Sequence, residues 1–237
     1  MPSPSVSSPS PSPSPAPSLL SVNVGRDTTD ELTGFTPGLR TGIDKRPVAG
    51  PVAVAAPGPR GVGGSGLAGD TITHLHLHGG DDQAVYAYAR EDLDRWQREL
   101  GRALPDGTFG ENFTTQGIDV SGALVGERWR VGPELVLEVT SPRIPCRMFA
   151  DWLGEQGWMK RFTQAAVPGA YLRVITPGEV RAGDPVTVVH RPAHSVTVSF
   201  LFRASTTERT LLPDVLAAGD ALPEATREKA LAYRASA

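Results

Sequence analysis

The sequence is almost free of cysteine: Cys146 is the single thiol in a chain of 237 residues. One cysteine cannot build a disulfide framework, so burial of apolar side chains has to stabilise the fold, and nothing in the cysteine content indicates an oxidising compartment. The sequence also lacks any apolar run that approaches the ~18 residues of a membrane-spanning helix, so we expect no contact with a membrane.

An excess of charge of one sign is missing as well. The chain has 23 Lys and Arg against 26 Asp and Glu, a net charge of -3 and a pI near 6.0. This balance excludes the strongly basic surface that wraps nucleic acid or adheres to anionic lipid. We therefore expect a small-molecule or protein partner and no nucleic acid.

The N-terminal region lacks the basic start and the apolar core of an export signal, so we expect a cytoplasmic protein. It alternates Pro and Ser instead, beginning "MPSPSVSSPSPSPSPAPS". Such a composition buries too little apolar surface to offset the entropy of ordering. The sequence predicts a disordered tail over residues 1–36, with the folded part beginning at residue 37.

Residues 37–192 have the pattern of a mainly β domain. Short segments, several of them alternating polar and apolar residues, are separated by Gly and Pro, which favours a β-barrel. The predicted strands are "VAGPVAV" (48–54), "DTITHLHLH" (70–78), "ALVGERWRV" (123–131), "ELVLEVT" (134–140), "GAYLRVI" (169–175) and "PVTVVHRP" (185–192).

Three regions predict helices. Residues 82–100 place apolar side chains at steps of three or four, and residues 150–166 form a second helix interrupted near Gly154 and Gly157. Residues 193–237, rich in Ala, Leu and Glu, predict a C-terminal extension of three short helices.

A glycine-rich stretch matches the spacing of a dinucleotide-binding loop at Gly61, Gly63 and Gly66. That loop must connect a strand to a helix, whereas here prolines precede it and a predicted strand follows, so we reject the match. Two interpretations stay open: a surface loop, or a backbone cradle for an anionic cofactor beside Arg60.

Three histidines recur in the predicted strand 70–78. Alternation along a strand places His74, His76 and His78 on one face, where imidazoles are able to ligate zinc. Consecutive side chains on a straight strand diverge too far for one tetrahedral ion, however. The favoured interpretation is that His74 and His76 are polar-face residues, while the turn at Gly79 holds His78.

Two further stretches carry chemistry. In "FGENFTTQGID" (109–119), Glu111 and Asn112 offer hydrogen bonds that suit a heterocycle. In "SPRIPCRMF" (141–149), Cys146 follows Pro145 and lies between Arg143 and Arg147. Most free cysteines are small buried hydrophobes, but neighbouring cations favour a thiolate that binds soft metals. From the chemistry alone both interpretations of Cys146 stay open.

The ordered set of motifs resembles the MOSC domain family, and within it the stand-alone bacterial branch that reduces N-hydroxylated purines. The likeness covers residues 41 to about 192, and the tail after His194 is similar to the three-helix extension of that branch. The motifs are "TGIDKRPV", "GLAGD", "HGGDDQAVYAY", "FGENFTTQGID", "GERWRVG", "LEVTSPRIPC", "PGAYLRV" and "PGEVRAGDPV".

The resemblance implies a β-barrel that carries a molybdenum–pterin cofactor, with Cys146 as the protein ligand to the metal. It also implies that His78, Asn112 and Arg143 line or support the pocket. Arg143 and either Lys45 or Arg60 are candidates for binding the cofactor phosphate. Because the aminotransferase-like domain of the full sulfurases is missing, no pyridoxal phosphate site is expected.

Two functions follow as hypotheses. The first is an oxidoreductase that reduces N-hydroxylated small molecules; because one cysteine cannot hold an iron–sulfur cluster, its electrons come from a separate flavin or iron–sulfur reductase. The second is a carrier that transfers the cofactor, or a persulfide sulfur on Cys146, to a client enzyme. A third, simpler alternative is a cofactor-free interaction barrel in which Cys146 is buried.

Overall fold

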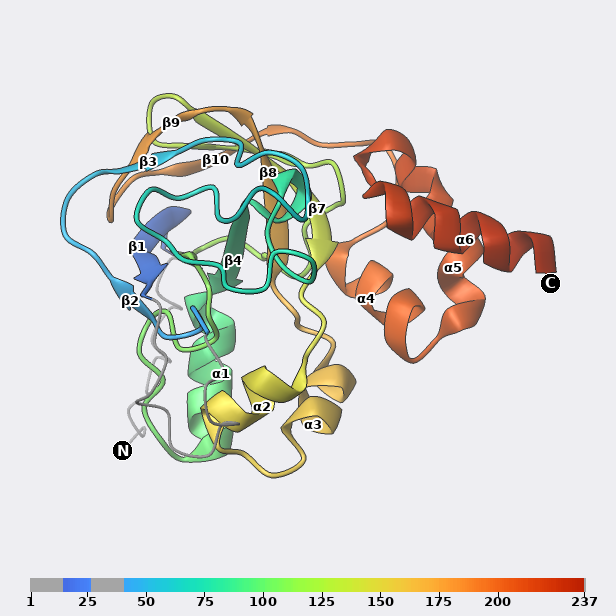
Figure 1. The fold of residues 1–237 in the computed structure, drawn as a ribbon, viewed down its shortest axis with the longest axis horizontal. Coiled ribbons are helices and arrows are strands. Elements are labelled where there is room, and N and C mark those ends of the chain that lie inside the picture. Colours follow the sequence, from blue (N-terminus) through green and yellow to red (C-terminus); the bar gives the residue numbers. More distant parts are fainter. Residues whose placement is uncertain (1–14, 27–40, 237) are drawn as a thin grey trace, which may run out of the picture.

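The computed structural model describes residues 15–26 and 41–236 and shows a mostly β body with several helices (Figure 1). The strands are β1 (Ser18–Gly25), β2 (Lys45–Pro47), β3 (Val52–Val54), β4 (Val85–Ala89), β5 (Phe113–Gln116), β6 (Arg128–Val131), β7 (Leu135–Pro142), β8 (Ala170–Thr176), β9 (Gly178–Val180) and β10 (Val186–His190). The helices are α1 (Arg90–Leu100), α2 (Arg147–Leu153), α3 (Trp158–Ala165), α4 (Val198–Thr206), α5 (Leu212–Val215) and α6 (Glu224–Ser236), with 3₁₀ turns at Asp81–Gln83, Arg209–Leu211 and Leu216–Ala221.

Eight strands form one sheet in the order β10-β6-β7-β8-β4-β5-β1-β2, in which only β4 and β5 run parallel. β3 and β9 form a separate pair. The sheet curls so that β1 approaches the segment before β10. Two backbone hydrogen bonds show this approach: Leu19 N donates to Asp184 O (2.9 Å), and Gly183 N donates to Leu19 O (2.7 Å). A single isolated bridge, not a continuous ladder, joins these two segments within the described residues. The predicted closed barrel is therefore not confirmed, although the mainly β character is.

β1 corrects the prediction of a disordered tail over residues 1–36. The strand pairs with β5 and β2, and its Leu19 and Val22 are buried in the core. Within the predicted tail, residues 1–14 and 27–36 lie outside the described residues. The short apolar stretch "LLSVNV" directly follows the Pro and Ser repeats. The prediction rested on the average composition of residues 1–36, in which this short stretch has little weight.

β4 corrects the first half of the predicted helix 82–100. All five residues of Val85–Ala89 are buried within the sheet, and the helix begins only at Arg90. A strand covered on both faces is apolar throughout, so its residues also satisfy a helical period. The second half is confirmed, since Leu93 and Trp96 are the buried residues of α1.

The predicted strand 70–78 is wrong. Leu77 N and His78 N both donate to His74 O at 2.9 Å, so the chain turns here. It is held against the glycine-rich loop, where Gly61 N donates to Leu75 O (3.2 Å) and Gly80 N donates to Gly64 O (3.1 Å). The alternation of His and Leu therefore does not define two faces of a sheet.

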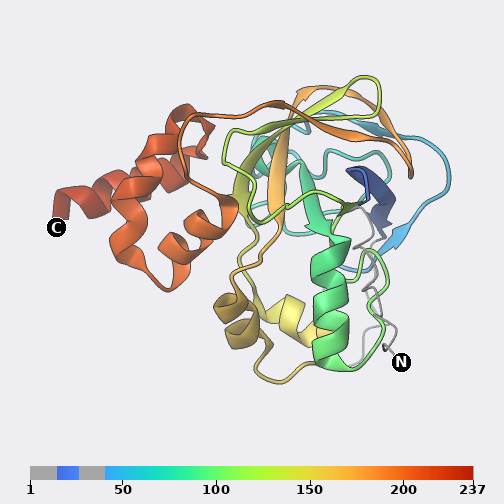
Figure 2. The ribbon, with the colours of Figure 1, turned by 180° about the vertical axis from the view of Figure 1, so that it is seen from behind.

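The helices form two groups, which are separate in the front view (Figure 1) and in the view from behind (Figure 2). α1, α2 and α3 enclose an aromatic cluster beneath the sheet that includes Trp96, Phe149 and Trp158. The predicted break between α2 and α3 is present, with Gly154 in the left-handed region at φ 66°. α4, α5 and α6 pack around their own apolar cluster beside β7 and provide the predicted C-terminal helices. None of the helices in the described residues has the length and apolar character that crossing a bilayer requires.

Candidate functional site

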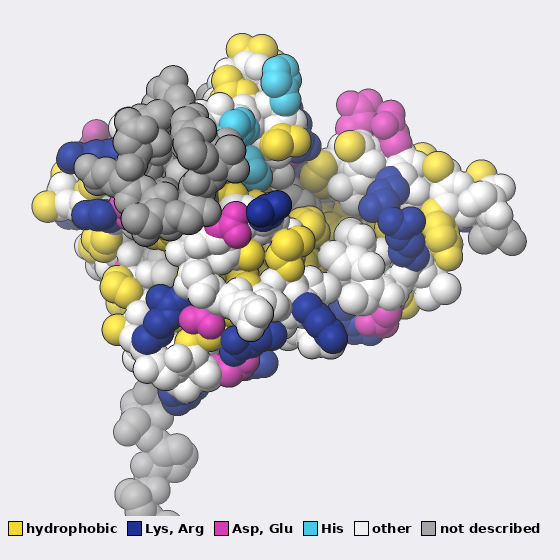
Figure 3. All heavy atoms as spheres, turned by 60° about the horizontal axis from the view of Figure 1, so that its bottom comes forward, with side chains coloured by type: hydrophobic (Ala, Val, Ile, Leu, Met, Phe, Trp, Pro, Cys, Tyr) yellow, Lys and Arg dark blue, Asp and Glu magenta, His cyan; other side chains and the backbone are white. Residues whose placement is uncertain are grey.

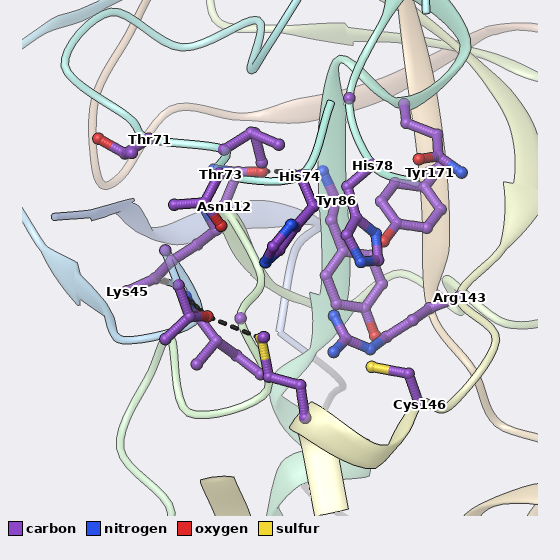
Figure 4. Close-up of a pocket in the computed structure, with 18 residues that line it drawn as sticks. Lys45, Thr71, Thr73, His74, His78, Tyr86, Asn112, Arg143, Cys146 and Tyr171 are labelled. Atoms are coloured by element: carbon purple, nitrogen blue, oxygen red, sulfur yellow. Dashed lines mark hydrogen bonds between the residues drawn. The ribbon is translucent and has the colours of Figure 1, made fainter. Parts of the chain in front are cut away.

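A pocket opens where the segment before β2, the 71–79 loop, the start of β4 and the segment between β7 and α2 meet (Figure 4). It encloses about 640 Å³ of empty space, including its open mouth. Of the six residues predicted from the sequence, five line it: Lys45, His78, Asn112, Arg143 and Cys146. The fold thus brings together residues that are up to about a hundred positions apart in the chain.

Cys146 is the residue immediately before α2, in extended backbone (φ -126°, ψ 168°). It is partly exposed, and its side chain does not cap the helix. Figure 4 shows its sulfur beside Arg143 and facing the pocket. β7 ends at Pro142, and Pro145 keeps the approach to the helix extended. Cys146 is therefore a thiol at a pocket wall that also touches the aromatic cluster.

Only one of the two neighbouring arginines shares the pocket. The side chain of Arg147 is 91% exposed and lies 3.5 Å from the Asp151 carboxylate, so it belongs to the outer surface of α2. The expectation that both cations flank the thiol is wrong for Arg147, because the first turn of the helix directs it away.

Arg143 is a buried cation, 8% exposed. Its guanidinium carbon lies 4.2 Å from the centre of the Phe149 ring and 5.3 Å from that of Tyr86. It forms no ion pair with a carboxylate of the described residues, and its buried Nε has no hydrogen-bond partner. Burial lowers the pKa of Arg143, whereas Tyr171 and Tyr86 raise it and make the net shift upward. Because burial raises the pKa of both phenols, they are neutral near pH 7 and do not compensate the charge of Arg143 there.

An uncompensated buried charge costs several kcal/mol, roughly 3 to 5 when a partner is missing. The two ring contacts offset only about 1 to 2 kcal/mol each. Arg143 is therefore a group that gains stability when an anion enters the pocket.

Lys45 lies in the same pocket, but its charge is already paired. Its ammonium contacts the carboxylate of Asp70, and both side chains are buried. Burial lowers the pKa of Lys45, whereas Asp70 raises it. Asp70 also accepts from Gly25 N (2.6 Å) and from Asn112 Nδ2 (2.8 Å). A phosphate contact by Lys45 stays a prediction, and the geometry favours a role in holding the wall.

Asn112 also supports the wall. Its Oδ1 accepts from Tyr86 N (3.1 Å), and its Nδ2 donates to Asp70 and to Asn23 O (3.3 Å). The side-chain amide of Asn112 therefore already forms hydrogen bonds within the protein. The predicted hydrogen bond from Glu111 to a heterocycle is wrong, because this side chain is fully buried and accepts from Gly107 N (2.5 Å), Phe109 N (2.9 Å) and Thr114 Oγ1 (2.9 Å).

The three histidines of residues 74–78 do not share one environment. His74 and His78 line the pocket, whereas His76 is exposed outside it. Burial, then the charges of Arg143, His74 and Arg60, lower the pKa of His78 to about 4, so this imidazole is neutral near pH 7. Within residues 15–26 and 41–236, no group of three His, Cys, Asp or Glu side chains is arranged to hold a metal ion, so the zinc interpretation finds no support.

Arg60 is the predicted residue that does not line the pocket. Its Nε and Nη2 donate to the carbonyls of His76 (3.2 Å) and Leu77 (2.6 Å), and its side chain lines a second cavity next door. Gly61, Gly63 and Gly66 do not line the pocket either. The glycine-rich stretch is thus a loop that packs against the turn at residues 74–78, which we call the histidine turn, and it does not form a cradle at the pocket wall.

The pocket residues without a role in the sequence prediction include Gln83, Tyr86 and Tyr171. The two tyrosine rings lie 5.1 Å apart between centres, on the same side of Arg143 (Figure 4), and burial raises the pKa of both. Gln83 has a buried Oε1 with no hydrogen-bond partner. The tyrosines lie in "HGGDDQAVYAY" and "PGAYLRV", where they were interpreted only as parts of a helix and a strand.

Together, fold and site define a mostly β protein with a pocket in which an accessible thiol lies beside a buried arginine that has no carboxylate partner in the described part of the chain. The chain belongs to the MOSC domain family, whose profile matches residues 74–187. It is 32% identical to the uncharacterized protein YflK of Bacillus subtilis over 186 residues, which are 78% of this chain and 79% of that protein.

Two further likenesses point the same way. A protein named reductase from Gibberella moniliformis is 28% identical over 73% of this chain, which corresponds to 29% of that longer protein. The crystal structure of YiiM from Geobacillus stearothermophilus superposes with a TM-score of 0.72 and 27% identity, covering 92% of this chain and 98% of YiiM. The fold is thus shared with YiiM, a stand-alone bacterial member.

Proposed function

We propose that this protein is a molybdenum-cofactor-dependent oxidoreductase that reduces N-hydroxylated bases or related compounds. The observation that carries the proposal is the juxtaposition in one pocket of the Cys146 thiol and the buried Arg143, whose Nε has no hydrogen-bond partner among the described residues. MOSC domains are associated with binding of the molybdenum cofactor, and a relative named reductase supports the reductive direction.

The residues present fit such a cofactor. Molybdenum in a pterin cofactor accepts a soft thiolate ligand, which Cys146 is placed to provide. The sulfur and phosphate groups of the cofactor are anionic, and Arg143 is a buried cation that forms no ion pair within residues 15–26 and 41–236. Phe149 and Tyr86 hold the guanidinium in place, while the neutral His78 adds a hydrogen-bonding group that brings no second charge.

When bound, the cofactor would supply the two-electron chemistry. The overall reaction takes R–NHOH, two electrons and two protons to R–NH₂ and water: the N–O bond breaks, and its oxygen leaves as water. The electrons come from a separate reductase of the flavin or iron–sulfur type, since a single cysteine cannot hold a cluster of its own. The chain contributes a ligand, charge compensation and a shaped pocket.

The test is replacement of Cys146 by Ser in protein purified without chelators. We expect the variant to fold normally and to lose molybdenum and reductase activity, whereas Arg147→Gln, which changes the exposed neighbour, should retain both. Sulfur that cyanide releases from the wild-type protein, together with no molybdenum, would instead favour the persulfide carrier.

A further inference from the structure

A second, larger cavity adjoins the pocket. This cavity encloses about 1770 Å³ of empty space with its open mouth, and it shares His78, Gly79, Gln83 and Tyr171 with the pocket. Its opposite side is formed by the C-terminal helices, through Leu201 and Ser205 of α4 and Ala225, Thr226 and Lys229 of α6. One ligand can therefore extend from the pocket toward the helices.

Two cations lie on different walls of this cavity. Arg60 comes from the glycine-rich loop and Lys229 from α6, and neither forms an ion pair with a carboxylate of the described residues. The guanidinium of Arg60 is held in place by two backbone carbonyls. The remaining Nη1 of Arg60 and the ammonium of Lys229 can contact an anionic ligand, and Ser205 and Thr226 add hydroxyl-bearing residues to the same cavity.

The acidic residues of the cavity are already engaged. Asp82 lies 2.7 Å from Arg173, and the carboxylate of Asp81 accepts from Gly58 N (2.8 Å). Apolar surface adjoins the charges, because Leu77 is 64% exposed and Ile144 is 49% exposed at the cavity wall. Figure 3 shows histidine side chains gathered on a lobe beside the groove that faces the C-terminal helices. Exposed aliphatic side chains next to two cations suit a sugar that carries a phosphate.

We infer that the second cavity binds the ribose phosphate of the substrate, so that the protein acts on N-hydroxylated nucleotides in preference to free bases. The inference rests on the proposed function for the reaction itself. It assigns Arg60 and Lys229 to the substrate phosphate and leaves Arg143 to the anionic group in the first pocket.

The kinetic test compares 6-hydroxylaminopurine as the free base, the ribonucleoside and the 5′-monophosphate, with the molybdenum-loaded protein and a chemical reductant. We expect kcat/KM to be at least about tenfold higher for the monophosphate than for the base, as one charge-assisted phosphate contact provides. In Arg60→Gln/Lys229→Gln that ratio should fall close to one. Equal kcat/KM for base and monophosphate in the wild type would overturn the inference.

A binding test separates this inference from the proposed reaction. AMP and adenosine are titrated by calorimetry into the protein as purified, without any turnover. AMP should bind at least about tenfold more tightly than adenosine, and the double variant should lose this difference. Lys160→Gln, a change at an exposed lysine of α3, should retain it.

The third measurement is the molybdenum content of the double variant and of the wild type. The double variant should contain as much molybdenum as the wild type; a loss of molybdenum would assign Arg60 and Lys229 to the cofactor and overturn the inference. A wild-type protein without molybdenum would contradict the proposed function, while preferential binding of AMP would still support the second cavity as a nucleotide site.

Discussion

At the scale of single residues, Arg143 carries the electrostatic argument. It is buried, stacked between aromatic rings and without a carboxylate partner among the described residues. Buried cations in proteins are ordinarily paired, because desolvation of a lone charge is costly. The most direct explanation is that its partner is an anion that the pocket receives.

Replacing Arg143 by Met tests this explanation. The cofactor-free variant should be at least as stable as the cofactor-free wild type, since removing a buried charge that costs roughly 3 to 5 kcal/mol offsets the loss of two ring contacts of about 1 to 2 kcal/mol each. Molybdenum content should fall at least about tenfold. Urea unfolding and elemental analysis provide the two readouts. A variant that is several kcal/mol less stable, yet fully loaded, would show that Arg143 serves only the fold.

Glu111 makes stability depend on pH. Burial raises its pKa from 4.5 to about 7, against hydrogen bonds from its own backbone, Gly107 and Thr114 that lower it. Between these values the folded protein holds a proton that the unfolded chain has released, so stability should fall as pH rises from 4.5 to 7. The slope from this group is at most about 1.4 kcal/mol per pH unit.

The measurement is urea unfolding at several pH values in the wild type and in Glu111→Gln. The difference in unfolding free energy between the two proteins should change with pH over this interval. A constant difference from pH 4.5 to 7 would show that Glu111 does not titrate there.

At the scale of elements, the histidine turn depends on glycine. Gly79 has φ +81°, and a Cβ placed on it would lie 2.7 Å from Gly64 O. Gly79→Ala should therefore combine backbone strain of about 1 to 3 kcal/mol with a displacement of the neighbouring His78.

The matched control is Gly183→Ala. Gly183 has a similar φ of +93°, but a Cβ there would meet nothing within 4 Å. Chemical denaturation should show a clearly larger loss of stability for Gly79→Ala. Equal losses would mean that only the φ angle, and not the contact between the two loops, is important.

β1 is the strand that the composition of residues 1–36 did not predict. Leu19 is fully buried between the strands of the sheet, so Leu19→Ala should cost about 2 to 5 kcal/mol of unfolding free energy. Val188→Ala, at a residue 37% exposed on β10, should cost far less. Similar melting temperatures for Leu19→Ala and the wild type would restore the prediction that the fold begins after residue 36.

The sequence predicted some elements better than others for physical reasons. Strands with one solvent-facing side alternate clearly, as β6 does with its exposed Arg128 and Arg130. The second half of the predicted strand 123–131 is therefore confirmed, whereas residues 123–127 lie before β6. β4 is buried on both faces and has no alternation to detect. The 70–78 segment alternates without being a strand, because its partner is a loop fixed by long-range backbone hydrogen bonds.

At the scale of the whole molecule, ordered motifs predicted the pocket, whereas local chemistry did not. From its neighbours alone, Cys146 was equally compatible with a buried position and a displayed one. Tertiary structure decides that Arg147 faces outward while Arg143 faces inward, and no local pattern contains this information. The same applies to Arg60, which shares the charge expected of a cofactor ligand but lies in the adjoining cavity.

The arrangement of the C-terminal helices also belongs to this scale. α4 and α6 complete the second cavity from the far end of the chain, so a substrate site there depends on contacts between the extension and the sheet. β1 already moves the start of the sheet ahead of residue 37, whereas the division between residues 37–192 and 193–237 stays a prediction, and the cavity suggests that these two parts act together.

The most direct measurement is the ratio of molybdenum to protein, with pterin measured in parallel, in the purified wild-type protein and in Cys146→Ser. The account predicts a ratio close to one in the wild type and close to zero in a correctly folded variant. A folded Cys146→Ser protein that retains molybdenum and pterin at the wild-type ratio would contradict the central claim that this thiol holds the cofactor.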